Sequence, residues 1–175
     1  SGKNAIIVTP NADLDLAVKD IAYSAFGHAG QKCSAASLVI LVGSVAKSKR
    51  FMRQLEDAVK SIHVAHPQDP MAQMGPVIEA PSGKLLEGLT SLEPGESWLL
   101  EPKKFDDSGK LWSPGIRTGV RPGSKSHKTE YFGPMLSVMT ARSLEDALAL
   151  QNAVEYGLTA GLHSLDPNEI NLWIS

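Results

Sequence analysis

The chain has 175 residues, of which 42% are hydrophobic and 21% charged, and its formal net charge is −2. This length and composition predict one domain with a substantial core, and they exclude a small disulfide-stapled scaffold and a disordered chain. Because acidic and basic side chains nearly balance, there is no overall electrostatic attraction to nucleic acid or to an anionic membrane. No apolar run is long enough to cross a bilayer.

Cys33 is the single cysteine, which excludes an internal disulfide and a cysteine-rich zinc site. The start SGKNAIIV has neither the basic leader nor the apolar centre of a signal peptide, so we expect a reducing, cytoplasmic location. The first residue is Ser1 rather than Met, and a strand-like run follows at once. We therefore expect the chain to be part of a longer protein.

The first third of the chain predicts a strand, a helix and a second strand. The apolar run Ala5–Val8 is typical of a buried strand, and Asn11 or Asp13 can cap a following helix that Gly27 and Gly30 end. The residues that form the predicted buried stripe of that helix are Leu14, Ala17, Val18, Ile21, Ala22 and Ala25. The continuous apolar run Leu38–Val42 predicts a strand covered on both faces.

Ser44 is the predicted N-cap of a second long helix. Its predicted buried face holds Phe51, Leu55, Val59 and Ile62, and its solvated face holds Lys47, Lys49, Arg50 and Lys60. Four prolines between His63 and Pro81 predict a surface loop, and a short helix is expected near Ser82–Ser91. Residues 93–126 are rich in proline and glycine, which indicates short strands and turns.

The last third predicts a strand over Met135–Ala141, a helix over Ser143–Asn152 and a short strand near Gly161–His163. Asp166 and Pro167, with Glu169 in the first turn, mark the start of a final helix. This alternation favours an α/β fold with an open, mostly parallel sheet flanked by helices, which we expect to be truncated at both ends.

Cys33 lies in a glycine-rich turn with small neighbours, and the adjacent cation of Lys32 favours its thiolate form. The alternative is a small, unreactive core cysteine. A cysteine hydrolase would need a histidine base, and the candidates are His28, His63, His66, His127 and His163. None lies in a partner motif. His63 and His66 lack further ligands at metal spacing, so we expect surface roles for them and no metal site.

Three segments carry a resemblance to a known family. FGHAGQKCSA around Cys33 resembles the catalytic-cysteine motif of the NAD(P)-dependent aldehyde dehydrogenase superfamily. TEYFGPML, which contains Glu130 and Phe132, resembles its cofactor-contacting motif, and SGKNAIIV resembles the strand after its general-base glutamate. Their order and the separation of about 100 residues between Cys33 and Glu130 also match, and the similarity covers essentially the whole chain.

Further segments resemble the glutamate-semialdehyde (1-pyrroline-5-carboxylate) dehydrogenases, including the domain found in bifunctional proline-utilisation enzymes. These segments are GQKCSA, LWSPGIRTGVRPGS, HKTEYFGPML and YGLTAGLHSLDPNEINLW. The resemblance implies NAD-dependent oxidation of L-glutamate γ-semialdehyde to L-glutamate in proline catabolism. The alternatives are an aldehyde dehydrogenase of different substrate specificity and a non-catalytic folded assembly module.

The resemblance also implies a role for each site residue. Cys33 would attack the aldehyde to form a thiohemiacetal and then a thioester, while Lys32 and Ser34 would contact the substrate carboxylate. Glu130 would bind the nicotinamide ribose, and Phe132 would press against the nicotinamide. Without the resemblance, Glu130 would be interpreted as an exposed loop acid and Phe132 as a core aromatic. Lys32 could equally point to solvent, with Ser34 only completing the turn.

In the family, the general-base glutamate, the oxyanion-hole asparagine and the dinucleotide-binding domain precede the part that this chain resembles. Residues 1–175 are therefore expected to be a partial catalytic domain without the NAD-binding domain. We expect the isolated chain to have negligible turnover and the parent protein to be an active homo-oligomer. We expect no nucleic-acid partner and no membrane insertion.

Overall fold

In a computed structural model, which describes residues 4–30, 36–129, 131, 133–154 and 160–174, six strands form one sheet with the order β3-β4-β5-β2-β1-β6. The strands are β1 (Asn4–Val8), β2 (Ala36–Val42), β3 (Ser97–Leu100), β4 (Gly115–Thr118), β5 (Met135–Ala141) and β6 (Ala160–His163). Strand β3 is antiparallel to β4, and every other neighbouring pair is parallel. The predicted α/β fold with a mostly parallel sheet is confirmed.

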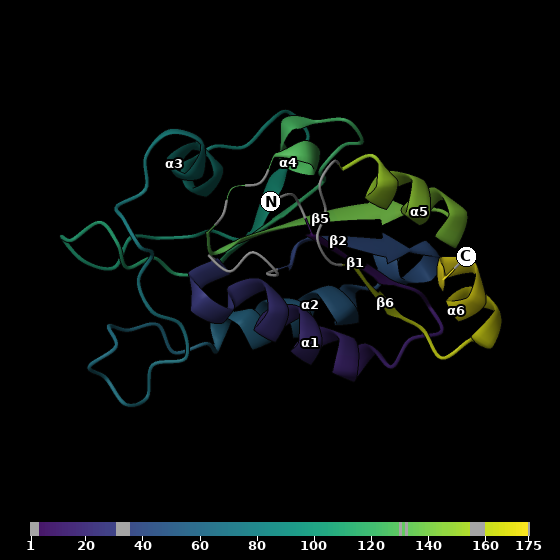
Figure 1. Ribbon diagram of the computed structural model, residues 1–175, viewed down its shortest axis with the longest axis horizontal. Coiled ribbons are helices and arrows are strands. Elements are labelled where there is room, and N and C mark those ends of the chain that lie inside the picture. The colour runs from purple at the N-terminus through teal and green to yellow at the C-terminus, as the bar shows by residue number, and fades with distance from the viewer. Residues whose placement is uncertain (1–3, 31–35, 130, 132, 155–159, 175) are drawn as a thin grey trace.

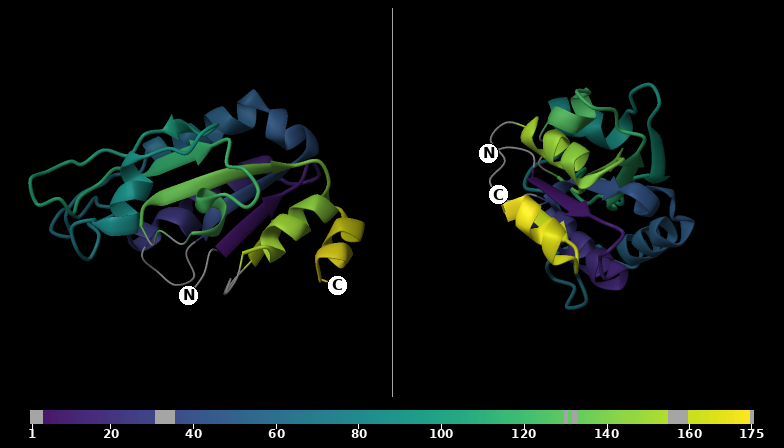
Figure 2. Two further views of the ribbon diagram at one scale, coloured as in Figure 1. Left: turned by 90° about the horizontal axis from the view of Figure 1, so that it is seen from above. Right: turned by 90° about the vertical axis from the view of Figure 1, so that its right-hand side faces the viewer.

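Helices cover both faces of this sheet (Figures 1 and 2). They are α1 (Leu14–Phe26), α2 (Lys49–Lys60), α3 (Gly83–Thr90), α4 (Lys125–Lys128), α5 (Leu144–Asn152) and α6 (Pro167–Ile174), with two 3-10 helices, η1 (Gly27–Gly30) and η2 (Gly43–Lys47). Helices α1 and α2 lie along one face, and α3, α4 and α5 lie on the other. Within the described part of the chain, no helix is both long and apolar enough to cross a membrane.

The central strands are buried on both faces because helices pack against each side. All five residues of β1 and the first five of β5 are buried, as expected for a parallel sheet between helical layers. On the α1–α2 side, Phe51, Leu55 and Val59 are fully buried, and each contributes about 1.5–3 kcal/mol to folding. The predicted stripe of the second helix is therefore confirmed over these residues.

The start of α2 differs from the prediction. Ser44 is not its N-cap, because Gly43, with φ of +58°, turns the chain into η2 before α2 begins. Ser48 takes the capping role, and its Oγ accepts a hydrogen bond from the Phe51 N–H at 3.1 Å. The buried Val45 side chain anchors the extra turn that separates the two serines.

The other predicted helix starts are confirmed. Asp13 caps α1 by accepting from the Leu16 N–H at 3.1 Å, and Ser143 caps α5 by accepting from the Asp146 N–H at 3.2 Å. The region predicted as short strands and turns contains β3 and β4, but its end also contributes to α4, for which Ser124 is the N-cap.

Candidate active site

The residues singled out from the sequence fall outside the described part of the chain. This holds for Cys33, Lys32 and Ser34 in the first motif and for Glu130 and Phe132 in the second. The structure does describe the segments that flank them. The candidate site is therefore built from these flanking residues.

Both motifs precede neighbouring parallel strands. Strand β2 begins at Ala36, shortly after Cys33, and β5 begins at Met135, shortly after Glu130. The two strands pair in parallel, with Leu38 opposite Ser137. Because parallel strands begin at the same edge of a sheet, both motifs lead into the sheet from its amino edge, the side at which β1, β2, β4, β5 and β6 begin.

The backbones of the two motifs touch at a pair of glycines. Gly30 adopts φ of +69°, and a Cβ added to it would lie 2.0 Å from the Gly133 carbonyl oxygen and 3.1 Å from that of Ala25. No side chain fits in this space, and the positive φ also favours glycine. The sequence indicated Gly30 only as the end of a helix, whereas the structure shows that it packs the cysteine motif directly against the second motif.

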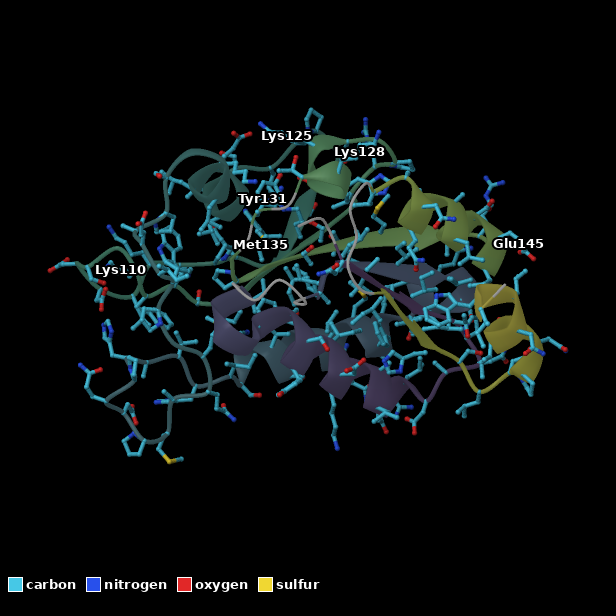
Figure 3. All side chains as sticks on the ribbon, in the orientation of Figure 1. Lys110, Lys125, Lys128, Tyr131, Met135 and Glu145 are labelled. Carbon is cyan, nitrogen blue, oxygen red and sulfur yellow. The ribbon has the colours of Figure 1, made fainter. Side chains whose placement is uncertain are left out.

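Helix α3 also packs against the second motif, through contacts separate from that of Gly30. A Cβ on Gly88 would lie 2.7 Å from Cδ1 of the Tyr131 ring, and one on Gly133 would lie 2.5 Å from Cδ1 of Leu85. Figure 3 shows Tyr131 near Met135, on the side of the sheet that carries α3 and α4. These contacts explain why a glycine occupies a helical position at Gly88, although glycine costs about 1 kcal/mol relative to alanine there.

A buried ion pair lies beside Tyr131, and sequence reasoning missed it. The Arg117 and Glu96 side chains are each only 1% exposed, and Arg117 Nη1 donates to Glu96 Oε1 at 3.0 Å. The same nitrogen donates to Ser126 Oγ at 2.7 Å, and Nη2 donates to the Gly88 carbonyl. One guanidinium thus connects β4 with α3, α4 and the turn before β3.

The Arg117 guanidinium also contacts two aromatic rings. Its Cζ lies 5.0 Å from the centroid of the Trp98 ring and 5.4 Å from that of Tyr131. Both distances fall in the range of cation–π attraction, which is stronger where water is excluded. Tyr131 is 5% exposed, and its ring packs against both the Arg117 guanidinium and the backbone of Gly88.

Two of the candidate histidines have structural partners away from the motifs. His127 Nδ1 accepts from the Gly123 N–H at 2.9 Å, so the proton of the neutral ring lies on Nε2, which donates to the Leu150 carbonyl at 2.9 Å. His163 Nε2 lies 2.7 Å from Asp20 Oδ2. These contacts account for both rings without a role as the base of a cysteine hydrolase.

His63 and His66 pair with carboxylates on surface loops, in line with the surface roles expected for them. His63 lies 2.9 Å from Asp69, and its hydrogen bond is the main cause that lowers the pKa of Asp69. His66 lies 2.6 Å from Asp106, whose pKa is lowered first by Ser108 and then by His66. Among the described residues, no group of three or more His, Cys, Asp or Glu side chains could hold a metal ion.

A groove of about 590 Å³ lies at the opposite, carboxyl edge of the sheet, beyond the ends of β2 and β5. It is lined by Gly43, Ser44, Ala46, Lys47, Thr140, Ala141 and Arg142. Ligands of open α/β sheets commonly bind at the carboxyl ends of the strands. This lining, however, contains no thiol, imidazole or carboxylate to act as nucleophile or base. We therefore place the candidate active site at the amino edge.

The chain resembles proteins of one family throughout its length. A family model described as "Aldehyde dehydrogenase family" matches residues 1–175. A 1-pyrroline-5-carboxylate dehydrogenase of Bacillus subtilis is 37% identical over 165 residues, which cover 92% of this chain and 31% of that protein. A second, from Geobacillus thermodenitrificans, is 34% identical over 172 residues and is matched over 33% of its length. The chain spans about a third of these curated relatives.

Solved structures agree with this fold. Proline utilization A (PutA) from Corynebacterium freiburgense is 58% identical with a TM-score of 0.96, and the match covers 100% of this chain and 18% of that one. A 1-pyrroline-5-carboxylate dehydrogenase from Thermus with bound NAD is 32% identical with a TM-score of 0.85, over 98% of this chain and 33% of that one. Since the family model matches every residue, the chain belongs to the aldehyde dehydrogenase family.

Proposed function

We propose that the protein carrying this chain oxidises L-glutamate γ-semialdehyde, formed from 1-pyrroline-5-carboxylate, to L-glutamate with NAD. The observation that carries the proposal is the backbone contact of Gly30 with Gly133, which brings the flanks of the cysteine motif and of the second motif together. The similarity to 1-pyrroline-5-carboxylate dehydrogenases supports the substrate. The similarity to PutA supports a role in proline catabolism.

In the proposed reaction, the Cys33 thiolate adds to the aldehyde carbon. A sulfur–carbon bond forms, and the electron pair of the carbonyl π bond moves to oxygen to give a thiohemiacetal oxyanion. The backbone N–H of Cys33 donates a hydrogen bond to this oxygen. Lys32 would favour the thiolate, since a nearby cation lowers the pKa of a thiol.

The carbon then loses its hydrogen together with two electrons and becomes a thioester. A nicotinamide cofactor held by Glu130 and Phe132 would supply the acceptor for this hydride. Water attacks the thioester, the sulfur–carbon bond breaks, and the thiolate of Cys33 returns. In sum, aldehyde, NAD⁺ and water become carboxylate, NADH and two protons.

Lys32 and Ser34 are proposed to recognise the α-carboxylate of the substrate. The cation would pair with the carboxylate, and the hydroxyl would donate a hydrogen bond to it. A simple aliphatic aldehyde has no group for these contacts. The two residues would therefore select glutamate semialdehyde over propanal.

Glu130 and Phe132 are proposed to bind the nicotinamide ribose and the nicotinamide ring. The structure is compatible with this role because their neighbours Tyr131 and Gly133 are tightly packed, which gives the motif a fixed backbone. Solved relatives include one with bound NAD and an NADP-dependent glyceraldehyde-3-phosphate dehydrogenase from Bacillus halodurans complexed with NADP. A nicotinamide cofactor is common to these relatives, and we propose NAD for this chain.

We propose that residues 1–175 form part of the catalytic domain and that turnover needs the remaining two thirds found in the relatives. The isolated chain is expected to give no steady NADH formation. The single thiol at Cys33 suits a reducing compartment such as the cytoplasm.

The test is NADH formation by the full-length protein with glutamate semialdehyde and with propanal. Cys33→Ala is expected to abolish activity with both aldehydes. Lys32→Met is expected to raise KM for the semialdehyde roughly tenfold, because a hydrogen bond to a charged group is lost, and to leave KM for propanal unchanged. Because the cation beside the thiol is also lost, kcat is expected to fall for both aldehydes alike. Equal use of both aldehydes by the wild type would refute carboxylate recognition, and activity of Cys33→Ala would refute the nucleophile.

A further inference from the structure

We propose that Arg117 is a positioning residue that fixes the cofactor-contacting motif through Tyr131. The Arg117 guanidinium lies next to the Tyr131 ring, and the backbone of Gly88 in α3 packs against the same ring. We call these three residues the clasp. This inference rests on the proposed function, since it assumes that Glu130 and Phe132 contact the cofactor.

The guanidinium of Arg117 is itself fixed by partners from three directions. Its Nη1 donates to Glu96 at 3.0 Å and to Ser126 at 2.7 Å, and its Nη2 donates to the Gly88 carbonyl. The side chain is only 1% exposed, so water does not compete for these bonds. Arg117 therefore offers Tyr131 a rigid surface rather than a mobile charge.

The Tyr131 ring has little room to move. The Arg117 Cζ lies 5.4 Å from its centroid, and a Cβ on Gly88 would approach Cδ1 of the ring to 2.7 Å. Leu89, Trp112 and Met135 belong to the same buried cluster and surround the ring further. Together these contacts fix the position of the ring, and with it the backbone of residue 131.

Stability alone does not account for a charged group at this place. A buried ion pair is often no more stabilising than apolar residues of similar size. Arg117 Nε and Glu96 Oε2 are also buried and have no hydrogen-bond partner among the residues that the structure describes, so the ion pair leaves part of its hydrogen-bonding capacity unused there. A planar guanidinium can, however, donate in several directions while one face stays on an aromatic ring, which neither lysine nor an aliphatic side chain can do.

Tyr131 lies between the two residues that are proposed to contact the cofactor, so the clasp can act on the cofactor through the backbone. Glu130 and Phe132 are its two covalent neighbours, so a shift of Tyr131 shifts the backbone that carries both. A displacement of about 1 Å in a positioned group can cost roughly a hundredfold in rate. The clasp would therefore set the affinity and placement of NAD without contacting it.

The test compares Arg117→Lys and Gly88→Ala in the full-length protein. Arg117→Lys keeps the charge beside Glu96 but loses the planar fork, and Gly88→Ala keeps α3 helical but pushes on the ring. Both are expected to speed hydrogen exchange of the backbone amides of residues 129–133 and to weaken NAD binding, measured by titration calorimetry, by roughly tenfold to a hundredfold. KM for the aldehyde is expected to stay unchanged. Folded variants with wild-type exchange and wild-type NAD affinity would overturn the proposal.

Leu55→Ala is the matched control. Leu55 is a fully buried residue of α2, which packs on the face of the sheet away from Tyr131. The change therefore destabilises the fold without altering the clasp. It is expected to leave NAD affinity unchanged. If it weakened NAD binding as much as Arg117→Lys, the effect would be a general loss of stability, and the clasp would be refuted.

The two proposals can fail separately. A wild type that binds NAD but oxidises no glutamate semialdehyde would refute the proposed substrate, while weaker NAD binding in the clasp variants would still support the positioning role. A wild type that does not bind NAD would overturn both.

Discussion

The two ends of the parallel strands are held together in different ways. At the amino edge, Gly30 and Gly133 bring two backbones into direct contact. At the carboxyl edge, side-chain bridges add to backbone hydrogen bonds such as that from the Leu165 N–H to the Asn11 carbonyl at 2.8 Å: Glu169 accepts from Thr9 Oγ1 at 2.7 Å and from Ser164 Oγ at 2.5 Å. The groove also lies at this second edge. This groove therefore does not coincide with the motifs that carry the proposed chemistry.

This difference has a physical basis. A backbone contact has no rotatable side chain to absorb a change, so the spacing of the two segments is fixed. A side-chain bridge can adjust its rotamers and exchange its bonds with water. We infer that the spacing at Gly30 and Gly133 is fixed, whereas the side-chain bridges of the carboxyl edge tolerate variation.

Among the substitutions considered, Arg117→Met is expected to lower the stability of the fold most. It leaves the Glu96 carboxylate buried without its cation, which is expected to cost about 3–5 kcal/mol in the free energy of unfolding. Asp20→Asn, at the half-exposed His163 pair of the carboxyl edge, is expected to cost less than about 1 kcal/mol. Urea denaturation of the full-length protein measures both.

The double variant Arg117→Met/Glu96→Met is the control for this prediction. Removing both charges should restore much of the lost stability, since no unpaired ion remains. If the double variant were as unstable as Arg117→Met alone, loss of packing rather than of charge pairing would explain the effect.

Gly30→Ala and Gly43→Ala separate backbone contact from backbone strain. Both glycines have positive φ, +69° and +58°, so the backbone strain of alanine is expected to cost about 1–2 kcal/mol at either, and the collision at Gly30 adds to that cost. A Cβ on Gly43 would lie 3.5 Å from the nearest atom, Pro10 Cγ, whereas one on Gly30 collides with backbone. Only Gly30→Ala should therefore also abolish NADH formation. Equal loss of activity in both variants would contradict the special role of the amino edge.

At low pH, the carboxyl edge is expected to lose the hydrogen bonds that Glu169 accepts at the start of α6. Burial alone would raise the pKa of Glu169, but hydrogen bonds from Ser164, Thr9 and Asn11 outweigh it and lower the pKa below 4.5. A lowered pKa means that these bonds stabilise the fold fully above the ordinary pKa and are lost as the pH falls through the lowered value. The protection of the backbone amides of residues 168–174, measured as their exchange rate relative to that of an unstructured chain at the same pH, should therefore fall on acidification, and Glu169→Gln should flatten this dependence.

The smallest effect is expected from a substitution in the groove, and it concerns catalytic activity. Arg142 is a polar lining residue remote from the motifs along β5, so Arg142→Ala should change kcat/KM by no more than about twofold. Steady-state kinetics of the full-length protein test this. A larger loss of activity would mean that the groove takes part in the reaction and that the two edges are not functionally distinct.

Local patterns predicted most of the fold. The strand Met135–Ala141 has the predicted bounds because its apolar run is continuous and turn residues flank it. The start of α2 was predicted wrongly because Ser44 and Ser48 are equally good caps locally. The choice depends on the turn at Gly43 and on burial of Val45, which are tertiary features.

The site was only partly predictable for a related reason. Motif resemblance pointed to Cys33 and Glu130, but the contact of Gly30 with Gly133 exists only after distant segments meet. Arg117 lies in the short strand β4, where a charged residue normally faces water. Its partners Glu96, Ser126 and Gly88 are separated from it and from one another in sequence, so no local pattern indicates that it is buried.

The strand order also sets the timing of folding. Ala5 pairs with Leu38 on one side of β1 and with Ala160 on the other. At a synthesis rate of about 5–20 residues per second, β1 waits on the order of ten seconds for its second neighbour. During that interval its apolar strand is an unpaired edge, open to pairing with other nascent chains. We therefore expect slow folding and a need for chaperones during synthesis, imposed by the position of β6 in the sheet.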